Sequence, residues 1–350
     1  MSGGVDSSVS AALLKQEGYD VIGVFIKVWQ ADFLPCTWRE ERRDAMRAAA
    51  HLGIPFLTLD LEKEYKKEVV DYMIREYGKG RVPNPDVMCN TYVKFGAFLE
   101  YAKKHGADFI ATGHYARRDE LGDEHRLRTG LDTKKDQSYF LWMLSQKALG
   151  QTLFPIGHLQ KSEVRKLART FGLLNAEKKD SQGLCFMGKV DVADFLKHYL
   201  KAEKGDVLND AGSIIGTHDG AMLYTIGQRH GFSTEKSSSA ESPYFVIGKD
   251  LQANTITVAH FISTKRQEGT VIISVEGFND IEGDFHEGKE GCVAQIRYHG
   301  AYYPVFIRAY DSARRFAQVE LTSLDQNPAA GQSIVFYQND TCLGGGVISE

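Results

Sequence analysis

The sequence predicts an α/β fold, with a parallel sheet flanked by helices in the first half and an antiparallel β structure in the second. In the first half, apolar runs of strand length alternate with helical stretches, a pattern typical of a parallel sheet covered by helices on both faces. From Gly205 onward, short alternating segments separated by turn residues predict a small antiparallel barrel or sandwich at the C-terminal end. A length of 350 residues favours two or three domains.

The first half supplies its elements in a regular order. Gly18 and Gly53 mark the ends of two predicted helices, because glycine readily adopts the left-handed conformation that closes a helix. The predicted helices cover residues 7–16, 39–52, 62–77 and 92–105. Continuous apolar runs predict buried strands, and these cover residues 21–28, 55–61 and 108–112. A loop over residues 81–90 precedes the fourth helix.

The second half begins with a mainly helical stretch over residues 161–200 that is interrupted near residues 180–188. Alternating apolar residues then predict short strands. These strands cover residues 223–226, 244–248, 255–259, 270–275 and 318–321. Residues 233–243 are rich in Ser and Glu, which predicts a surface loop.

The composition is that of an ordinary globular protein, with 43% hydrophobic and 25% charged residues. No apolar run approaches the roughly 20 residues that span a bilayer, and no targeting segment precedes the first motif, so we expect a cytoplasmic location. The net charge is −4, and an RNA partner therefore requires a local basic cluster. Residues 161–179 are one candidate cluster, and a solvated helix face is the alternative interpretation.

The first eight residues, Met1 to Ser8, predict a phosphate-binding loop. They precede a helix, whose unpaired N–H groups and dipole attract anions. Gly3 and Gly4 allow the backbone to approach a phosphate closely, and Asp6 is suited to orient Mg²⁺ or to cap the helix. The lysine of the P-loop NTPases is absent, which excludes that class of loop. A Gly-Ser turn before an N-capped helix is the simpler alternative.

Five cysteines occur without the spacing of a zinc site, so we interpret them as free or catalytic thiols. Cys89 lies near the start of a predicted helix, where the pKa of a thiol is lowered, and Asp86 precedes it by three residues. Cys185 lies in a predicted loop between two glycines. The remaining three are predicted to be small buried residues; they are Cys36, Cys292 and Cys342.

An ordered set of motifs extends over nearly the whole chain. The set consists of Ser2-Gly-Gly-Val-Asp-Ser7, Asn84-Pro-Asp-x-x-Cys89, Ala111-Thr-Gly-His-Tyr115, Lys135-Asp-Gln-Ser-Tyr-Phe140, Ser181-x-Gly-x-Cys-Phe186, Gly227-Gln-Arg229 and Cys342-Leu-Gly-Gly-Gly346. In this order they resemble the bacterial tRNA-specific 2-thiouridylase family of the PP-loop ATP pyrophosphatase superfamily. The resemblance implies a fold like the adenine nucleotide alpha hydrolases. It also implies a catalytic domain over 1–190, a central tRNA-binding domain over 191–262 and a C-terminal β-barrel over 263–350.

The resemblance also implies roles for individual residues. Cys89 would be the nucleophile, Cys185 the persulfide carrier and Asp86 a further catalytic residue. ATP with Mg²⁺ would be bound by Met1, Ser2, Gly3, Gly4, Val5, Asp6, Ser7, Ser8, Ile26 and Gly113. The tRNA would be contacted by Asn84, Pro85, Asp86, His114, Lys135, Asp136, Gln137, Arg297, Tyr298 and Gln332. The remaining partner would be an upstream persulfide donor, namely a cysteine desulfurase or a sulfur-relay protein.

The implied reaction is ATP-dependent 2-thiolation of a wobble uridine. Adenylation turns the uridine oxygen into a leaving group, and sulfur from Cys185 replaces it. Either the persulfide attacks the base directly or Cys89 first releases sulfide, and both routes end in a Cys89–Cys185 disulfide. Family members have a strand leading into the phosphate loop, whereas this sequence begins within the loop. We therefore expect the first strand to be missing.

Simpler interpretations exist for the implied tRNA contacts. His114 would also suit a structural histidine at a strand end, residues 135–140 a helix start with Asp136 as its cap, and residues 297–303 an exposed strand. For the whole chain, the alternatives are another PP-loop adenylating ligase, which needs no paired cysteines, and an inactive, truncated tRNA-binding protein, which would bind no ATP.

Overall fold

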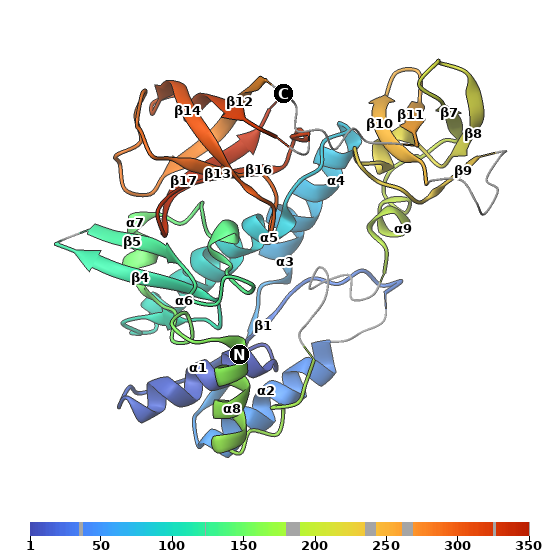
Figure 1. The fold of residues 1–350 in the computed structure, drawn as a ribbon. Coiled ribbons are helices and arrows are strands. Elements are labelled where there is room, and N and C mark those ends of the chain that lie inside the picture. Colours follow the sequence, from blue (N-terminus) through green and yellow to red (C-terminus); the bar gives the residue numbers. More distant parts are fainter. Residues whose placement is uncertain are drawn as a thin grey trace.

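The computed structural model describes residues 1–34, 38–122, 124–179, 190–234, 243–260, 269–324 and 327–349. Three regions follow one another along the chain (Figure 1). The N-terminal region contains two parallel strand pairs, a five-stranded sheet forms the central region, and a large antiparallel sheet forms the C-terminal region. The predicted α/β fold class is confirmed. Within the described residues, no helix is both long and apolar enough to cross a bilayer.

The helices of the N-terminal region agree with most of the predicted ones. They are α1 (Val5–Gln16), α2 (Trp38–Leu52), α3 (Glu62–Tyr65), η1 (Lys66–Val70), α4 (Asp71–Gly78), α5 (Pro85–Met88), η2 (Cys89–Ala97), α6 (Phe98–Lys104), η3 (Ser138–Phe140), α7 (Gln146–Gly150) and α8 (Lys161–Thr170). Helix α1 packs against α8 through the fully buried Val9 and Val164. Both helices lie with α2 at the lower end of the molecule in Figure 1.

The helix predicted at residues 92–105 begins instead at Pro85, so the predicted start was wrong. Asn84 is the cap: its side chain accepts a hydrogen bond from the Val87 N–H at 3.4 Å. Pro85 occupies the first helical position, which tolerates proline because its missing N–H would be unpaired there anyway. We had interpreted this proline as part of a loop. As a consequence, Cys89 lies inside a continuous helical run, at the start of the π-helical segment η2.

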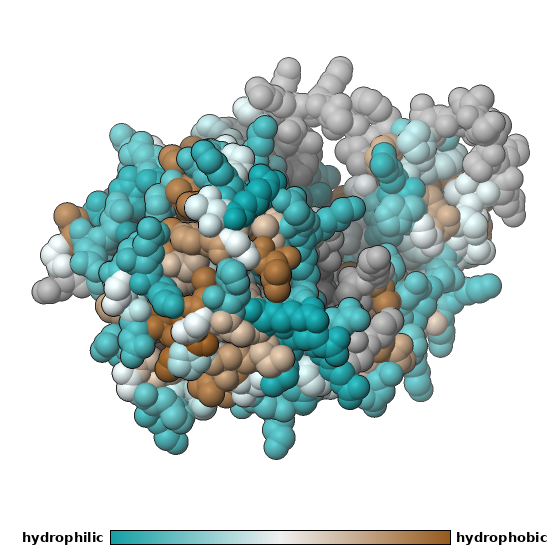
Figure 2. All heavy atoms as spheres, turned by 90° about the horizontal axis from the view of Figure 1, so that it is seen from below, coloured by the Kyte–Doolittle hydropathy of each residue, from teal (hydrophilic) through white to brown (hydrophobic). Residues whose placement is uncertain are grey.

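The parallel strands of the N-terminal region form two separate pairs among the described residues. Strand β1 (Gly23–Lys27) pairs with β2 (Phe56–Asp60), and β3 (Ile110–Ala111) pairs with β6 (Thr152–Leu153). Short pairs bury less apolar surface than a wide sheet. Accordingly, Leu57 of β2 is 45% exposed, and apolar side chains gather at the surface when the molecule is viewed from below (Figure 2). The predicted parallel sheet, covered by helices on both faces, is therefore present among the described residues only as two short strand pairs.

The C-terminal sheet includes a hairpin that we did not predict. Strands β4 (Ala116–Leu121) and β5 (Glu124–Thr129) pair with each other, and β5 pairs with β17 of the C-terminal region. The other strands are β12 (Thr270–Asp280), β13 (Val293–Gln295), β14 (Tyr302–Asp311), β15 (Phe316–Thr322), β16 (Ser333–Gln338) and β17 (Thr341–Ile348). Because β12 also pairs with β17, these strands close on themselves, which confirms the predicted antiparallel barrel.

The central region contains α9 (Val192–Leu196), η4 (Ala221–Leu223) and a five-stranded sheet. Its strands are β7 (Gly205–Leu208), β8 (Ile214–His218), β9 (Phe232–Thr234), β10 (Phe245–Asp250) and β11 (Thr255–Ala259). The strand predicted at residues 223–226 is wrong: a 3-10 turn follows Gly220, whose φ of 132° ends the extended chain. The interruption predicted near 180–188 lies outside the described residues, as does most of the loop predicted at 233–243.

Candidate active site

The phosphate loop is held in shape by its own hydroxyl groups. Ser7 Oγ accepts a hydrogen bond from the Ser2 N–H at 3.2 Å. The hydroxyls of Ser7 and Ser8 both donate to the Gly4 carbonyl, at 3.2 and 3.0 Å. Helix α1 follows at once and has twelve residues, so its first N–H groups and its dipole face the loop. This arrangement is suited to bind a phosphate anion.

Two glycines are required by close backbone contacts at this loop. Gly3 has a φ of +79°, and a Cβ there would lie 2.4 Å from the Glu41 carbonyl oxygen of α2. A Cβ on Gly113 would lie 2.8 Å from backbone atoms of Asp6 and Ser7. The segment after β3 therefore touches the first turn of α1. Of the other predicted ATP residues, Gly113 thus lies against Asp6 and Ser7 of the loop, while Ile26 lies half-buried on β1.

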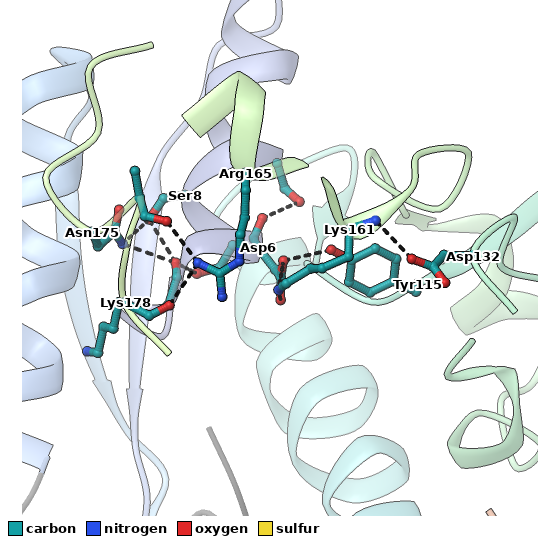
Figure 3. A network of polar contacts seen from close by, with 12 residues as sticks. Asp6, Ser8, Tyr115, Asp132, Lys161, Arg165, Asn175 and Lys178 are labelled. Atoms are coloured by element: carbon teal, nitrogen blue, oxygen red, sulfur yellow. Dashed lines mark hydrogen bonds and ion pairs between the residues drawn. The ribbon is translucent and has the colours of Figure 1, made fainter. Parts of the chain in front are cut away.

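Asp6 is the centre of a polar network that our sequence analysis only partly anticipated (Figure 3). Lys161, at the start of α8, donates to both carboxylate oxygens of Asp6, at 2.8 and 2.9 Å. The Tyr115 hydroxyl donates to Asp6 at 2.9 Å, and the Lys161 ammonium lies 5.6 Å from the centre of the Tyr115 ring. Asp132 accepts from the Lys161 backbone N–H at 2.9 Å. The carboxylate of Asp6 is thereby fixed beside the loop.

The segment after α8 completes this network. The Asn175 side-chain amide donates to the carbonyls of Gly3 and Gly4 and to Ser8 Oγ, at 3.1, 3.2 and 2.9 Å. Lys178 donates to the Gly3 carbonyl at 3.3 Å and to Asp44 of α2 at 2.8 Å. Figure 3 shows the Asn175 side chain beside Ser8 of the loop. The roles of Asn175 and Lys178 could not be read from spacing, because they follow the loop by more than 150 residues.

These contacts bear on the two interpretations of the basic cluster at residues 161–179, namely an RNA-binding patch and a solvated helix face. Lys161 and Lys178 point toward the phosphate loop, and Arg165 donates to the carbonyls of Ala176 and Lys178 at 2.9 and 3.2 Å. A merely solvated helix face does not describe these three residues, whereas an RNA contact through the exposed Lys166 and Arg169 stays a prediction. Arg169 pairs with Glu177 on the surface at 2.7 Å, so only the outer side of α8 is solvated. The inner side supplies cations to the loop.

The Cys89 side of the molecule has a different character. Cys89 is 6% exposed and belongs to the main hydrophobic core. One turn earlier, Asp86 is partly buried, and this burial raises the pKa of its carboxyl group, while the Lys94 ammonium acts in the opposite direction. Asn90 is 3% exposed and donates to the Phe140 carbonyl at 3.1 Å. The first helical turns thus carry polar groups into a largely apolar surrounding.

His114 lies against this helix and is 8% exposed. Its ring packs beside Phe95 of η2 and Phe154, with centroid distances of 5.6 and 6.3 Å. Nδ1 lies 2.8 Å from the Thr112 hydroxyl. Burial lowers the pKa of His114 well below its usual value, and the nearby Lys94 ammonium lowers it further. The imidazole is therefore neutral near pH 7, so that it can form hydrogen bonds but carries no charge.

The C-terminal barrel supplies aromatic groups to the same place. Burial raises the pKa of Tyr298 to about 12, and the neighbouring carboxylates of Asp136 and Asp86 raise it as well. The Tyr298 and Phe140 rings lie 4.3 Å apart. Gln332 donates to the Val82 carbonyl at 2.9 Å, just before Asn84. The barrel thus contacts both the loop before α5 and the segment containing Asp136.

Three residues predicted to contact tRNA form hydrogen bonds within the protein; they are Lys135, Asp136 and Gln137. Asp136 is 8% exposed and accepts from the N–H groups of Gly130 and Ser138 at 2.8 and 3.1 Å. It thereby fixes the turn before the short helix η3, but the N-cap residue of η3 is Gln137, so the alternative of Asp136 as the cap is wrong. The Gln137 side chain accepts from the Tyr115 N–H at 3.0 Å. Lys135 is half-buried, and its backbone N–H donates to the Asp132 carbonyl at 2.9 Å.

The remaining predicted contacts differ in exposure. Pro85 is buried, whereas Asn84, Arg297 and Tyr298 are half-buried. The positive charge of Arg297 acts on the buried Tyr139. Residues 296–301 form no strand, because β13 ends at Gln295 and β14 begins at Tyr302; the alternative of an exposed strand is therefore wrong for most of residues 297–303.

The segment Thr112–Tyr115 joins the two sides of the site. Gly113 abuts the phosphate loop, His114 packs on the helix that carries Cys89, and Tyr115 binds both Asp6 and Gln137. Four consecutive residues therefore contact the anion-binding loop on one side and the thiol-bearing helix on the other.

Of the other cysteines, two lie within the described residues, and both are buried. Cys292 and Cys342 are 4% and 0% exposed, and burial raises the pKa of both thiols. This confirms the prediction that they are buried residues. Cys36 and Cys185 lie outside the described residues. Within the described part of the chain, no three His, Cys, Asp or Glu side chains gather as a metal site.

Comparison with known proteins gives matches along the whole chain. Residues 1–189 match the tRNA methyl transferase HUP domain, 193–260 the tRNA methyl transferase PRC-barrel domain, and 271–348 the aminomethyltransferase beta-barrel domain. The chain is 45% identical to the tRNA-specific 2-thiouridylase MnmA of Enterococcus faecalis, over 99% of this chain and 93% of the relative.

A second relative is equally similar. The tRNA-specific 2-thiouridylase MnmA of Geobacillus thermodenitrificans is 44% identical over 100% of this chain and 93% of its own length. Among solved structures, NMN synthetase from Francisella tularensis is 16% identical, with a TM-score of 0.32 over 51% of this chain and 63% of that chain. A similarity at that level carries no argument about function.

Proposed function

This chain belongs to the tRNA-specific 2-thiouridylase family, and on that premise we propose that it replaces the oxygen at position 2 of a tRNA wobble uridine with sulfur, at the expense of ATP. The observation that carries the proposal is the segment Thr112–Tyr115, because it contacts the phosphate loop through Gly113 and the Cys89 helix through His114. Activation of a base and attack by sulfur require these two sites to be adjacent.

ATP fits the loop by its chemistry. The N–H groups at the start of α1, the ammonium groups of Lys161 and Lys178 and the loop hydroxyls are all suited to phosphate oxygens. Gly3 and Gly113 leave no room for side chains where the backbone approaches most closely. Mg²⁺ bound together with ATP commonly takes one or two protein carboxylates, and Asp6 would be its ligand here. It would neutralise charge on the departing pyrophosphate.

The uridine would enter beside Asn84 and Asp86, splayed out of the anticodon loop. Its O2 atom attacks the α-phosphorus of ATP, pyrophosphate leaves, and the base is held as an adenylate. Asp86 accepts the proton lost from the imide N–H of the ring, and the pKa of its carboxyl group, raised by burial, supports this role as a base. The aromatic ring of Tyr298 supplies a surface for stacking from the barrel side.

Sulfur then replaces AMP at carbon 2. A persulfide on Cys185, formed by an upstream donor, provides the terminal sulfur atom. As that atom bonds to carbon 2 and AMP leaves, the Cys89 thiolate attacks the Cys185 sulfur and the S–S bond of the persulfide breaks. The result is a 2-thiouridine and a Cys89–Cys185 disulfide, which a cellular thiol reductant reopens. The tRNA substrate and the reductant are consistent with a cytoplasmic location.

The test is a pair of substitutions with a matched control. Cys89→Ser and Cys185→Ser should each abolish 2-thiouridine formation, measured by mass spectrometry of digested tRNA with ATP and a persulfide donor. Both should bind ATP with unchanged affinity in calorimetry. Cys292→Ser is the control, because Cys292 is a buried barrel residue, and it should retain activity. If Cys89→Ser thiolates tRNA at the wild-type rate, the proposed role of this sulfur is wrong.

A further inference from the structure

Lys94 is a charged residue on the thiol-bearing helix to which the proposed reaction assigns no task. It belongs to the π-helical segment η2, which begins at Cys89. In a π-helix the backbone bonds join residues i and i+5, so Lys94 stands one turn after Cys89. Its ammonium donates to Asn90 Oδ1 at 2.9 Å, while the Asn90 amide is itself fixed by the Phe140 carbonyl at 3.1 Å. The orientation of the Lys94 side chain is therefore determined.

The charged and titratable groups around Lys94 come from several elements. Asp86 of α5 and His114 of the joining segment both lie within electrostatic range of its ammonium. On the barrel side, Tyr298 faces Asp86. Asp86, Asn90 and Lys94 are spaced by four residues along one continuous helical run, which places them on one face. The Lys94 ammonium thus acts on a carboxyl group and an imidazole, and it is bonded to Asn90, the residue that follows Cys89.

We propose that Lys94 is a positioning residue of the sulfur-transfer site: its ammonium holds the Cys89 sulfur as a thiolate and the Asp86 carboxyl group in its ionised form. This inference rests on the proposed function. It adds a residue that acts through its charge, without contact to the transferred sulfur. π-Helical segments are frequent at functional sites, and this one sets Lys94 five residues, or one π-helical turn, after Cys89.

The need for such a cation follows from burial. Cys89 is 6% exposed, and burial in apolar surroundings disfavours a thiolate. The same holds for Asp86, whose pKa is raised by burial and is brought back toward normal by Lys94. The thiolate is the species that attacks the persulfide. A fixed positive charge one turn away therefore offsets the cost of forming it in this place.

The first experiment measures ionisation of the thiol without tRNA. The ultraviolet absorbance of the thiolate is titrated in the full-length protein, and the Cys89→Ser titration is subtracted to isolate Cys89. In Lys94→Met, with Lys94→Met/Cys89→Ser subtracted, the midpoint should rise by about one pH unit, as expected for loss of a neighbouring opposite charge. Lys94→Arg should restore it. Lys103→Met is the control on the adjoining helix α6, and its midpoint should equal that of the wild type.

The second experiment measures single-turnover thiolation of tRNA against pH. Lys94→Met should be about tenfold slower at neutral pH, in line with the shifted midpoint, and should approach the wild-type rate at alkaline pH. Lys94→Gln serves the same purpose if Lys94→Met does not fold. A midpoint unchanged in both uncharged variants overturns the inference. Absence of thiolation by the wild type would instead overturn the proposed function, because the titration does not depend on it.

Discussion

The phosphate loop and the Cys89 helix are adjacent, yet they are stabilised in opposite ways. At the loop, charged groups are paired. Asp6 accepts hydrogen bonds from Lys161 and Tyr115, and Lys178 donates to Asp44. At the helix, titratable groups are desolvated, so that burial raises the pKa of Asp86 and lowers that of His114.

This difference matches the two tasks that we assign. An anion-binding site benefits from donors that are already oriented, because binding then requires little reorganisation. A reactive site benefits from groups displaced from their usual pKa, since these exchange protons near neutral pH. The two sites should therefore respond differently to substitution: ATP affinity should depend on the loop, and sulfur chemistry and tRNA affinity on the helix and the barrel.

The largest effect should come from Gly113→Ala. A Cβ at this position lies 2.8 Å from backbone atoms of Asp6 and Ser7, and neither backbone can move without disturbing the loop. Overpacking of this kind costs about 1–3 kcal/mol, so we expect ATP affinity to fall by about 100-fold at the upper end. Calorimetry with a non-hydrolysable ATP analogue measures it.

Gly248→Ala provides the matched control, because its Cβ would meet Thr257 at an ordinary 3.6 Å. It should bind the analogue like the wild type. If Gly113→Ala bound the analogue as tightly as the wild type, the segment Thr112–Tyr115 would not be part of the ATP site. It would then no longer connect the ATP site to the Cys89 helix.

A smaller effect on the same ligand is expected for Lys161→Met. The substitution removes two charge-assisted hydrogen bonds to Asp6 and a cation beside the phosphates. Charge-assisted bonds contribute about 1.5–3 kcal/mol, and since Asp6 is partly exposed we expect roughly tenfold weaker ATP binding. Lys166→Met, on the exposed side of the same helix, should have no effect. If Lys161→Met weakened tRNA binding instead, α8 would be an RNA surface after all.

The role of Lys161 shows where sequence analysis reaches its limit. The phosphate loop could be predicted because its residues are consecutive and their chemistry is local. Lys161 and Asn175 reach the loop only through the packing of α8 on α1, and nothing in their spacing indicates this contact. Likewise, the sequence predicts a loop over residues 81–90, whereas the extended Asn84 is the cap of a helix that begins at Pro85. The alternation of short strand segments and turn residues predicted the barrel, but not the β4–β5 hairpin that pairs with it.

The third prediction tests the barrel side through Arg297→Ala. Arg297 lies near the buried Tyr139 on the face where Tyr298 meets Asp86. Loss of one phosphate contact should weaken tRNA binding by about fivefold and reduce the slope of log affinity against log salt by about one, while ATP affinity stays unchanged. Arg314→Ala is the control, because that side chain is 85% exposed in a turn of the same barrel. An unchanged salt slope would count against a tRNA contact.

The smallest effect concerns stability and depends on pH. Burial raises the pKa of Asp86, so the folded protein is penalised when the carboxyl group is ionised. The penalty is fully present above the raised pKa and disappears as pH falls below the normal value of 3.8. Asp86→Asn should therefore raise the melting temperature near pH 7, by no more than about 3 °C, while impairing thiolation. The gain should vanish in acid.

Asp340→Asn should show the opposite sign. Hydrogen bonds from Arg128 and Arg117 lower the pKa of Asp340, so its ionised form stabilises the fold at pH 7 and that contribution is lost as pH falls through the lowered pKa. Thermal unfolding of both variants from about pH 3 to about pH 8 separates the two cases, because the Asp340 contribution is lost only below the normal pKa of 3.8. A lower melting temperature for both at pH 7 would show that Asp86 is held by favourable contacts, and the distinction between a paired and a desolvated carboxylate would no longer apply to this site.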